Sequence, residues 1–507
     1  MRRHCGEGAT VTQHNLWPTP WYRAGDRIAC GSDPPYCTLA KSRGVSAALG
    51  ASQAIHAIRC VQNTSPMPSV TTETAPDNTV ALTSAAGAAA LLLLVVAPRS
   101  SPGCVALLLA ALYLSGPPGP PSRVFSLPRP GMPLALLLGF AGWAAVSIAW
   151  AADRGEAINK AALLAAFATA TAVAATALVE ARRDLLQRAG RAALAAFAVG
   201  LIYLGVEEIT GQGLKRLLFL ALPFARPDTR HIVGNDGDAV FAEYFHNRNI
   251  AAATLALWPM LLIARHVVEP RQFRAVIAGI AAIALVTLAF SQHETSILAL
   301  AASSIIGVAV LAAPRLGLGL LAAGWLAATL LVVPMATWGL RTAELHKAEW
   351  LPHSARHRIV LWGYTAEQIQ HRPLHGIGAA STKALDVRRG PHVETFPGTR
   401  FGWRSGTHAH NVYLQIWYEL GAIGALLLCG AGLAAIQALS RLPPAVLPAA
   451  AATMTAAVVM GASSWGLWQA WFLGAFAMSG MLLLIGIRLS STRPTPSPGI
   501  EPAPNRL

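Results

Sequence analysis

The chain has 507 residues, of which 54% are hydrophobic and only 12% are charged, and its mean hydropathy is +0.46. A soluble domain carries about a quarter charged residues, so this composition excludes an ordinary soluble protein. The formal net charge of +15 comes from short basic runs between apolar segments, which argues against nucleic acid as a partner. The lipid bilayer and anionic lipid-linked substrates are the partners that we expect.

The first part of the chain differs from the rest. Residues 1–78 combine Cys, Pro, His, Thr and Ser without an apolar run long enough to cross a membrane. We predict that they form a poorly ordered N-terminal extension. Residues 79–490 are predicted to form a transmembrane domain, and residues 491–507 a disordered C-terminal tail.

From Val80 onward, apolar runs of helical length alternate with short polar turns. Because about 20 residues in a helix cross the hydrocarbon core, this pattern predicts an all-α fold, a polytopic membrane helical bundle of about twelve transmembrane helices. The second span is short, since Pro102 precedes it and a Gly-Pro run follows it. The predicted spans are residues 80–97, 103–116, 132–150, 158–179, 190–207, 248–265, 273–291, 296–313, 316–340, 411–437, 444–463 and 467–487.

Basic residues are unevenly distributed between the turns. Those after even-numbered spans carry most of the Arg and Lys, whereas the short turns after odd-numbered spans carry few. The positive-inside rule then predicts a multi-pass protein of the bacterial inner membrane with both termini in the cytoplasm. Two polar blocks, residues 208–247 and 341–410, face the periplasm, and the second forms a large loop that caps the bundle. The arginines of these two blocks run against the positive-inside rule, which indicates that they are retained for a function.

Five short phrases of this chain resemble, in the same order, phrases of the bacterial O-antigen ligase and O-antigen polymerase superfamily. Members of that superfamily are polytopic membrane glycosyltransferases with a large late periplasmic loop. The resemblance covers about residues 130–490. The phrases are Ser147-Ile148-Ala149-Trp150 with Asp153, Phe245-His246-Asn247-Arg248-Asn249, Arg358-Ile359-Val360-Leu361-Trp362, Pro373-Leu374-His375-Gly376-Ile377-Gly378, and His408-Ala409-His410-Asn411 with Glu419-Leu420-Gly421. The chain departs from the family at Glu294, an acid where many members have a basic residue after Ser-x-Ser.

The resemblance implies transfer of a glycan from a polyprenyl diphosphate carrier to an acceptor sugar hydroxyl, without a metal or other cofactor. The acceptor would be a glycan or glycolipid, namely the lipid A-core for an O-antigen ligase. Three alternatives stay open: an O-antigen or exopolysaccharide polymerase, transfer of an oligosaccharide to protein, and a transporter of lipid-linked glycan. A transporter is expected to carry ionisable groups in mid-membrane and broken helices in paired halves, whereas here the charges cluster outside the spans.

A diphosphate leaving group needs charge stabilisation more than an acid, and the planar guanidinium of arginine binds phosphate oxygens in pairs. We therefore predict that Arg248 and Arg358 hold the diphosphate. Arg248 falls in the first turn of a span, where free N–H groups also favour an anion. The plainer alternatives are an Arg248 that only snorkels to the interface and an Arg358 that is a solvated loop charge.

The acceptor hydroxyl is a poor nucleophile, so a base that titrates near neutral pH is expected. His408 and His410 are the candidate catalytic residues, with His410 the favoured base and His408 a residue that orients a partner. Asn411 is predicted to cap the next helix. Ordinary loop histidines, or a metal site built from His408, His410 and a third histidine, are the alternatives. The resemblance also places Asn247, Asn411 and Trp362 among the residues expected to bind the diphosphate or the glycan.

Two further features have structural interpretations. Gly376 and Gly378 are predicted to form a turn where the backbone passes close to a neighbour. Glu419 falls inside a predicted span, where a buried acid needs a partner, so we expect it to meet an arginine or a backbone donor.

Overall fold

The computed structural model describes residues 27–30, 37–40, 77–114, 131–222, 232–233, 240–241, 243–390 and 393–491. The chain divides into two compact units, Met1–Glu73 and Thr74–Leu507. In the first unit, β1 (Arg27–Cys30) pairs antiparallel with β2 (Cys37–Ala40). Apart from this pair, most of the predicted N-terminal extension lies outside the described residues, as does nearly all of the predicted C-terminal tail.

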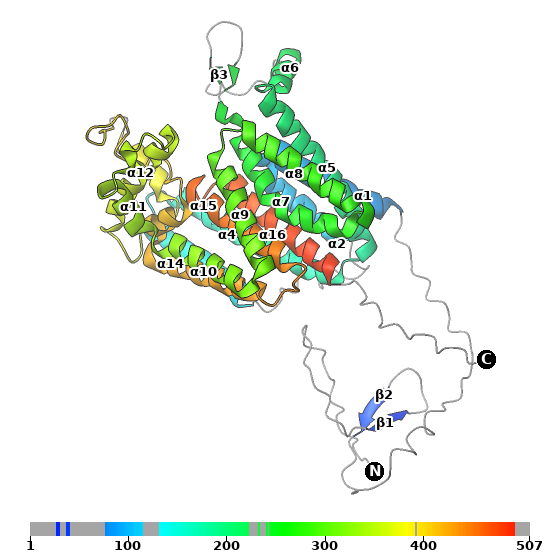
Figure 1. Ribbon diagram of the computed structural model, residues 1–507. Coiled ribbons are helices and arrows are strands. Elements are labelled where there is room, and N and C mark those ends of the chain that lie inside the picture. Colours follow the sequence, from blue (N-terminus) through cyan, green and yellow to red (C-terminus); the bar gives the residue numbers. More distant parts are fainter. Residues whose placement is uncertain are drawn as a thin grey trace, which may run out of the picture. The chain divides into compact units, whose positions relative to one another are not determined.

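The second unit is a bundle of helices, which confirms the predicted all-α polytopic fold (Figure 1). Each predicted span contains a helix. The strands β3 (Ile232–Val233) and β4 (Val240–Phe241) form a small hairpin. The helices are α1 (Asp77–Val96), α2 (Ser101–Leu114), α3 (Met132–Val146), α4 (Arg154–Glu180), α5 (Arg183–Ile209), α6 (Gly213–Ala221), α7 (Asn247–Val267), α8 (Pro270–Phe290), α9 (Glu294–Ala312), α10 (Pro314–Leu330), α11 (Val332–Arg341), α12 (His353–Ile369), α13 (Ser381–Arg388), α14 (Val412–Leu439), α15 (Leu447–Ser463) and α16 (Ala470–Ser490).

The number of full-length spans is smaller than the predicted twelve. In the described part of the chain, nine helices are long and apolar enough to cross a membrane, or ten if α10 and α11 count as one span. The predicted span over 316–340 is a pair of helices, α10 and α11, which are bent by 69° relative to each other. Pro334 explains the break, since it has no N–H to bond the carbonyl of Leu330. The helices α2 and α15, of 14 and 17 residues, are short for a crossing.

The core of the bundle surrounds α7 and α16, which pack against each other. The apolar window of α7 is 78% buried and that of α16 is 67% buried, whereas α3 and α8 are only 22% buried. Small residues such as Ala251, Ala252 and Ala256 are almost fully buried on α7 and allow close packing of its neighbours. The first turn of α7 therefore belongs to the most deeply buried of the nine candidate spans in the described part of the chain.

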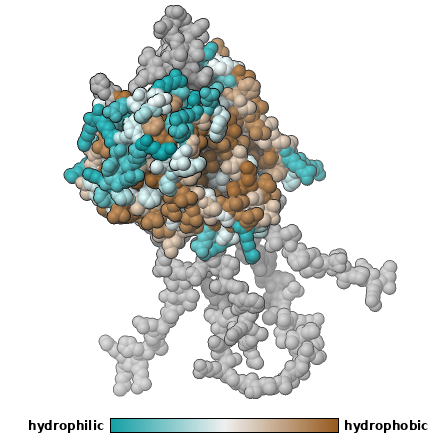
Figure 2. Space-filling view, turned by 60° about the vertical axis from the view of Figure 1, so that its left-hand side comes forward, coloured by the Kyte–Doolittle hydropathy of each residue, from teal (hydrophilic) through white to brown (hydrophobic). Residues whose placement is uncertain are grey.

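One end of the bundle carries the predicted cap, residues 341–410. It contains α12 and α13 beside long connecting segments, and α11 leads into it (Figure 1). Figure 2 shows hydrophilic side chains gathered over one part of the surface and hydrophobic side chains over much of the remainder. The cap has its own apolar cluster, made by Leu340, Ile359, Val360, Phe396 and Phe401. The cap is therefore held together by its own apolar side chains and lies at one end of the bundle.

A break in α14 anchors the cap. Gly421 has φ 64° and ψ −166° inside this helix, which leaves nearby backbone groups without helical partners. The segment from Pro373 to Gly378 fills the break: Ile377 N–H donates to Tyr418 O at 3.1 Å, and Ala422 N–H donates to Pro373 O at 2.8 Å. A side chain at Gly376 would collide with the backbone of Glu419. The predicted close backbone approach at this turn is confirmed.

Candidate functional site

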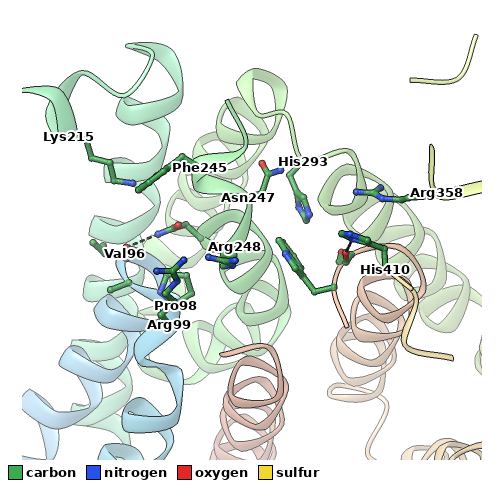
Figure 3. A pocket seen from close by; sticks show the side chains of 14 residues that line it. Val96, Pro98, Arg99, Lys215, Phe245, Asn247, Arg248, His293, Arg358 and His410 are labelled. Carbon is green, nitrogen blue, oxygen red and sulfur yellow. Dashed lines mark hydrogen bonds between the residues drawn. The ribbon is translucent and has the colours of Figure 1, made fainter. Parts of the chain in front are cut away.

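A cavity of about 470 Å³ lies where the cap meets the bundle, and we name it the arginine cavity. Arg99 and Arg248 lie on one side of it, Arg358 and His410 on the other, and His293 between them (Figure 3). The cavity is lined by Val96, Ala97, Pro98, Arg99, Lys215, Phe245, Asn247, Arg248, Asn249, His293, Arg358, His410, Ser464 and Trp465.

The lining comes from turns far apart in the sequence. Arg99 follows the first predicted span, Lys215 the fifth, His293 the seventh, Arg358 the ninth and Ser464 the eleventh. The structure therefore gathers the turns after odd-numbered spans at one end of the bundle.

Arg248 stands in the first turn of α7 and faces the cavity (Figure 3). Its guanidinium carbon lies 5.8 Å from the ring centroid of Trp471. Its Nε atom is buried without a hydrogen-bond partner among the described residues, as is Oδ1 of the adjacent Asn247. Buried polar atoms normally find partners, so these two atoms on one cavity wall are available to a polar ligand or to water. The position also opposes a pure snorkelling role for Arg248, because the side chain lines an internal cavity.

Arg358 lies on α12, one turn after Ser354. Ser354 Oγ donates to Glu294 Oε2 at 3.2 Å. Burial lowers the pKa of Arg358, and the negative charge of Glu294 acts against that shift. Glu294, the residue that departs from the family pattern, thus tethers the first turn of α12 and supports the charge of its arginine.

His410 is held in a defined orientation. Its Nδ1 lies 2.7 Å from Ser464 O, and because a carbonyl oxygen only accepts, Nδ1 carries the proton. Nε2 is left with a lone pair, which is the state that a general base needs. Burial lowers the pKa of His410, and Arg358 lowers it further. The backbone at His410 has φ 53°, an unusual value for a residue with a side chain and one that often accompanies functional sites.

His408 lies beside His410, with the ring centroids 4.2 Å apart. Its Nδ1 contacts Thr407 Oγ1 at 3.0 Å, while its Nε2 is buried without a hydrogen-bond partner in the described structure. Burial lowers the pKa of His408 to about 3, with further contributions from His410 and the nearby arginines. Both imidazoles are therefore neutral near pH 7.

Two more cavities meet the first. The second, of about 820 Å³, is named the hairpin cavity after a short hairpin of the cap that is closed by a bridge between Thr395 and Gly402. It is lined by His353, His357, Leu361, Val393, Thr395, Arg400, Phe401, Gly402, Arg404, Gly406, Thr407, His408 and His410. The Glu419 cavity, of about 630 Å³, is lined by Glu156, Lys160, Arg248, Ala380, Lys383, Thr407, His408, Gln415, Glu419, Gly466, Trp468 and Gln469. His410 lines the arginine and hairpin cavities, His408 the hairpin and Glu419 cavities, and Arg248 the arginine and Glu419 cavities.

Asn411 and Trp362 line none of these three cavities. Asn411 caps α14, with its Oδ1 accepting from Leu414 N–H at 3.0 Å, so the predicted cap is confirmed. Trp362 Nε1 donates to Ala409 O at 2.8 Å. Both side chains fix the backbone on either side of His410, and their predicted contact with substrate stays a prediction.

Three ionisable residues of the arginine cavity were not among the predicted site residues. They are Arg99, Lys215 and His293. Arg99 carries a signal that could have found it, since it is a basic residue in a short turn after an odd-numbered span. Burial lowers the pKa of Lys215 to about 7, against the opposing charges of Glu207 and Glu208. Burial likewise lowers the pKa of His293 to about 3, with a contribution from Arg358.

Glu419 is buried on α14 and meets backbone donors, as predicted. Its carboxylate accepts from Ala380 N–H at 2.8 Å and from Thr382 N–H at 3.1 Å, and also from Trp468 Nε1. Its role in this arrangement is to join α13, α14 and the turn before α16. Among the described residues, no group of three or more His, Cys, Asp and Glu is placed to hold a metal ion.

The fold and this charged site at one end of the bundle define the class: a polytopic helical membrane protein. Residues 279–429 match the family model described as O-Antigen ligase. This range holds His293, Arg358 and His410, whereas Arg99 and Arg248 lie before it. The predicted resemblance to the bacterial O-antigen ligase and O-antigen polymerase superfamily is thereby confirmed over this range.

Curated relatives agree with that family. The chain is similar to a protein of Rickettsia felis named "Putative polysaccharide ligase", with 28% identity over 138 residues, 27% of this chain and 32% of the relative. Relatives with the same type of name in Rickettsia conorii and Rickettsia prowazekii are 29% identical over 138 residues and 27% identical over 144 residues, with the same shares covered. The match thus spans about a third of the length of these relatives.

Proposed function

We propose that this protein is a metal-independent membrane glycosyltransferase of the O-antigen ligase type. It moves a glycan from a polyprenyl diphosphate carrier to an acceptor sugar hydroxyl. The observation that carries the proposal is the single cavity in which a neutral, oriented imidazole at His410 faces the guanidinium groups of Arg248 and Arg358.

The donor diphosphate is assigned to the arginine cavity. Arg99, Arg248 and Arg358 bring three guanidinium groups to one cavity, and no acidic side chain of the part of the chain that the structure describes lines it. Like charges held together at a partly buried site are costly without an anion, so the arrangement favours a bound diphosphate. The orphan Nε of Arg248 and the first-turn N–H groups of α7 are available to the phosphate oxygens.

The reaction is a direct displacement. His410 Nε2 takes the proton of the acceptor hydroxyl while its oxygen bonds to the anomeric carbon. The bond between that carbon and the phosphate oxygen breaks, and the diphosphate leaves with the electron pair, stabilised by the arginines. A single displacement inverts the anomeric centre. Retention of configuration in the product, read by NMR of the new linkage, would contradict this mechanism.

For the acceptor we propose the lipid A-core, as in a ligase, with a glycan polymerase as the alternative of the same superfamily. Deleting the gene and separating the lipopolysaccharide on a gel distinguishes them. A ligase leaves the core without any O-chain, because attachment itself fails. A polymerase leaves a single repeat on the core, because attachment continues while extension stops.

We further propose that the site faces the periplasm, from the inner membrane, with both termini in the cytoplasm. The basic turns after even-numbered spans support this orientation, as does the gathering of the odd-numbered turns around the arginine cavity. Cysteines placed at exposed positions of the cap should react with a membrane-impermeant reagent added to spheroplasts. Reaction only after lysis would overturn the orientation.

The main experiment uses purified protein in lipid vesicles with a polyprenyl diphosphate-linked glycan and a lipid A-core acceptor. We expect transfer by the wild type and a loss of about 10²- to 10⁴-fold in kcat for His410→Gln, the range for a general base. His371→Gln is the matched control, because His371 is an exposed histidine of the same cap that lines none of the three cavities. Full activity of His410→Gln would refute its role, and absence of transfer by the wild type would refute the proposed function.

A further inference from the structure

The hairpin cavity is built on a short hairpin of the cap. Thr395 and Gly402 form an antiparallel bridge, and Phe396 N–H donates to Phe401 O at 2.8 Å. The two phenylalanines are each 8% exposed and pack with Leu340 and α12. The hairpin is therefore pinned by its apolar side chains, and its polar residues are left to line the cavity.

The arginines of this cavity are its cationic groups. Arg400 and Arg404 line the hairpin cavity, together with four histidines, and no carboxylate is among the described residues of its lining. Arg404 Nε lies 3.5 Å from Asp386 Oδ1, which stands outside the lining. Arg400 is exposed and forms no ion pair among the described residues. Two guanidinium groups in an acid-free cavity favour an anionic ligand.

The cavity also offers a surface for a sugar ring. Phe401 lies on its wall, with the His357 ring stacked at 5.5 Å and the His353 ring at 5.0 Å between centroids. Burial lowers the pKa of His357, which leaves that imidazole neutral and able to take part in an apolar face. Aromatic rings of this kind contact the C–H face of a sugar while charged neighbours hold its substituents.

The position of His410 links the two cavities. It lines both the arginine cavity and the hairpin cavity, so a hydroxyl in the second and a glycosyl diphosphate in the first reach the same imidazole from different sides. A direct displacement requires the nucleophile and the leaving group on opposite sides of the anomeric carbon. The geometry therefore suits an acceptor in the hairpin cavity.

We propose that the hairpin cavity binds the acceptor and selects a saccharide that carries a phosphate or a carboxylate, which Arg400 and Arg404 hold while its hydroxyl reaches His410. This inference rests on the proposed function and adds the chemical class of the acceptor and two residues that determine specificity. Neither arginine touches the reacting atoms in this arrangement.

The test compares acceptors that differ only in charge. Protein in vesicles receives a saturating lipid-linked donor and either a phosphorylated glycolipid or the same glycolipid after phosphatase treatment. A second pair is a uronic acid glycolipid and its reduced, neutral form. We expect the wild type to favour the charged member of at least one pair by tenfold or more in kcat/KM. A preference within the first pair identifies phosphate as the recognised anion, and a preference within the second identifies a carboxylate.

Substitution then assigns the preference to the two arginines. Arg400→Gln and Arg404→Gln should each raise the KM for the charged acceptor about tenfold, with kcat, the donor KM and the KM for the neutral acceptor little changed. Arg372→Gln is the control, an exposed arginine of the cap outside the cavity. Equal use of charged and neutral acceptors by the wild type would overturn the inference. So would variants that change only the donor KM, because the cavity would then hold the donor glycan.

The two failures are distinguishable. A wild type that transfers glycan to both members of each pair equally refutes the anionic acceptor and leaves the proposed function intact. A wild type that neither transfers glycan nor releases polyprenyl diphosphate refutes the proposed function itself.

Discussion

The arginine cavity and the hairpin cavity share His410, yet they are built in different ways. Two arginines of the arginine cavity stand on packed helices, Arg248 in the first turn of α7 and Arg358 on α12. Those of the hairpin cavity, Arg400 and Arg404, stand on a connecting segment held by two phenylalanines. The core fixes the first set, while loops tolerate change with little effect on a fold. The difference suggests a constant donor site beside an adaptable acceptor site.

The largest test of this comparison is removal of Arg248. Arg248→Ala should lower kcat about 10²- to 10³-fold, because the substitution removes a hydrogen-bonding cation that stabilises the negative charge developing on the leaving diphosphate. The same factor should appear with every acceptor, since we propose that the arginine cavity binds the glycan donor. Arg248→Lys should recover only part of the rate, because an ammonium cannot bind two phosphate oxygens in parallel.

The measurement is initial rate in vesicles with two different acceptors. Arg265→Ala is the control, because Arg265 lies near the opposite end of the same helix and donates to Ala445 O. A loss confined to one acceptor would break the division between a donor and an acceptor cavity.

The second test is the dependence of rate on pH. Burial lowers the pKa of His410, so its imidazole binds a proton only at pH values below the usual range for histidine, which lies near 6.5. Because the neutral form is the base, kcat/KM should stay constant as pH falls through 6.5. It should then decline about tenfold per pH unit below the lowered pKa.

Rates should be measured from pH 8 to pH 4, and each sample returned to pH 7.5 to detect irreversible unfolding. An acid limb centred at the ordinary histidine value, with full recovery afterwards, would mean that the essential base is a solvent-exposed group and not His410.

The third test concerns Glu294. Glu294→Gln keeps an acceptor for Ser354 but removes the negative charge beside Arg358, so the donor KM should rise about fivefold, or about 1 kcal/mol. Glu349→Gln, an exposed acid of the cap, is the control. Because Glu294 acts through Arg358, the substitution should have no further effect in an Arg358→Gln background. An additive loss in the double variant would assign Glu294 a separate role.

The sequence predicted the parts of this arrangement that depend on local pattern. Apolar length predicted the helices, and the family phrases predicted that Arg248, Arg358 and His410 would matter; the structure brings all three to one cavity. The break at Gly421 and the bend before α11 were not predicted, because each depends on backbone groups satisfied by distant segments. Arg99 and His293 are single residues in short turns. Their place in the site follows from helix packing, which no local pattern reports.

The test with the smallest expected effect asks whether Trp362 positions His410 or binds a substrate. The tryptophan donates to Ala409 O, between the two histidines, so Trp362→Phe removes one hydrogen bond and keeps an aromatic ring. The loss should be about 1 kcal/mol of stability, seen as a lower Tm, with kcat reduced a few fold and both KM values unchanged. Trp338→Phe is the control, since Trp338 is 48% exposed. If Trp362 instead binds substrate, as predicted from the sequence, Trp362→Phe should leave Tm near the wild-type value and raise the KM of one substrate, because phenylalanine presents a smaller face. That result would show that Trp362 contacts a substrate and does not only position His410. The acceptor or donor site would then extend beyond the cavities described above.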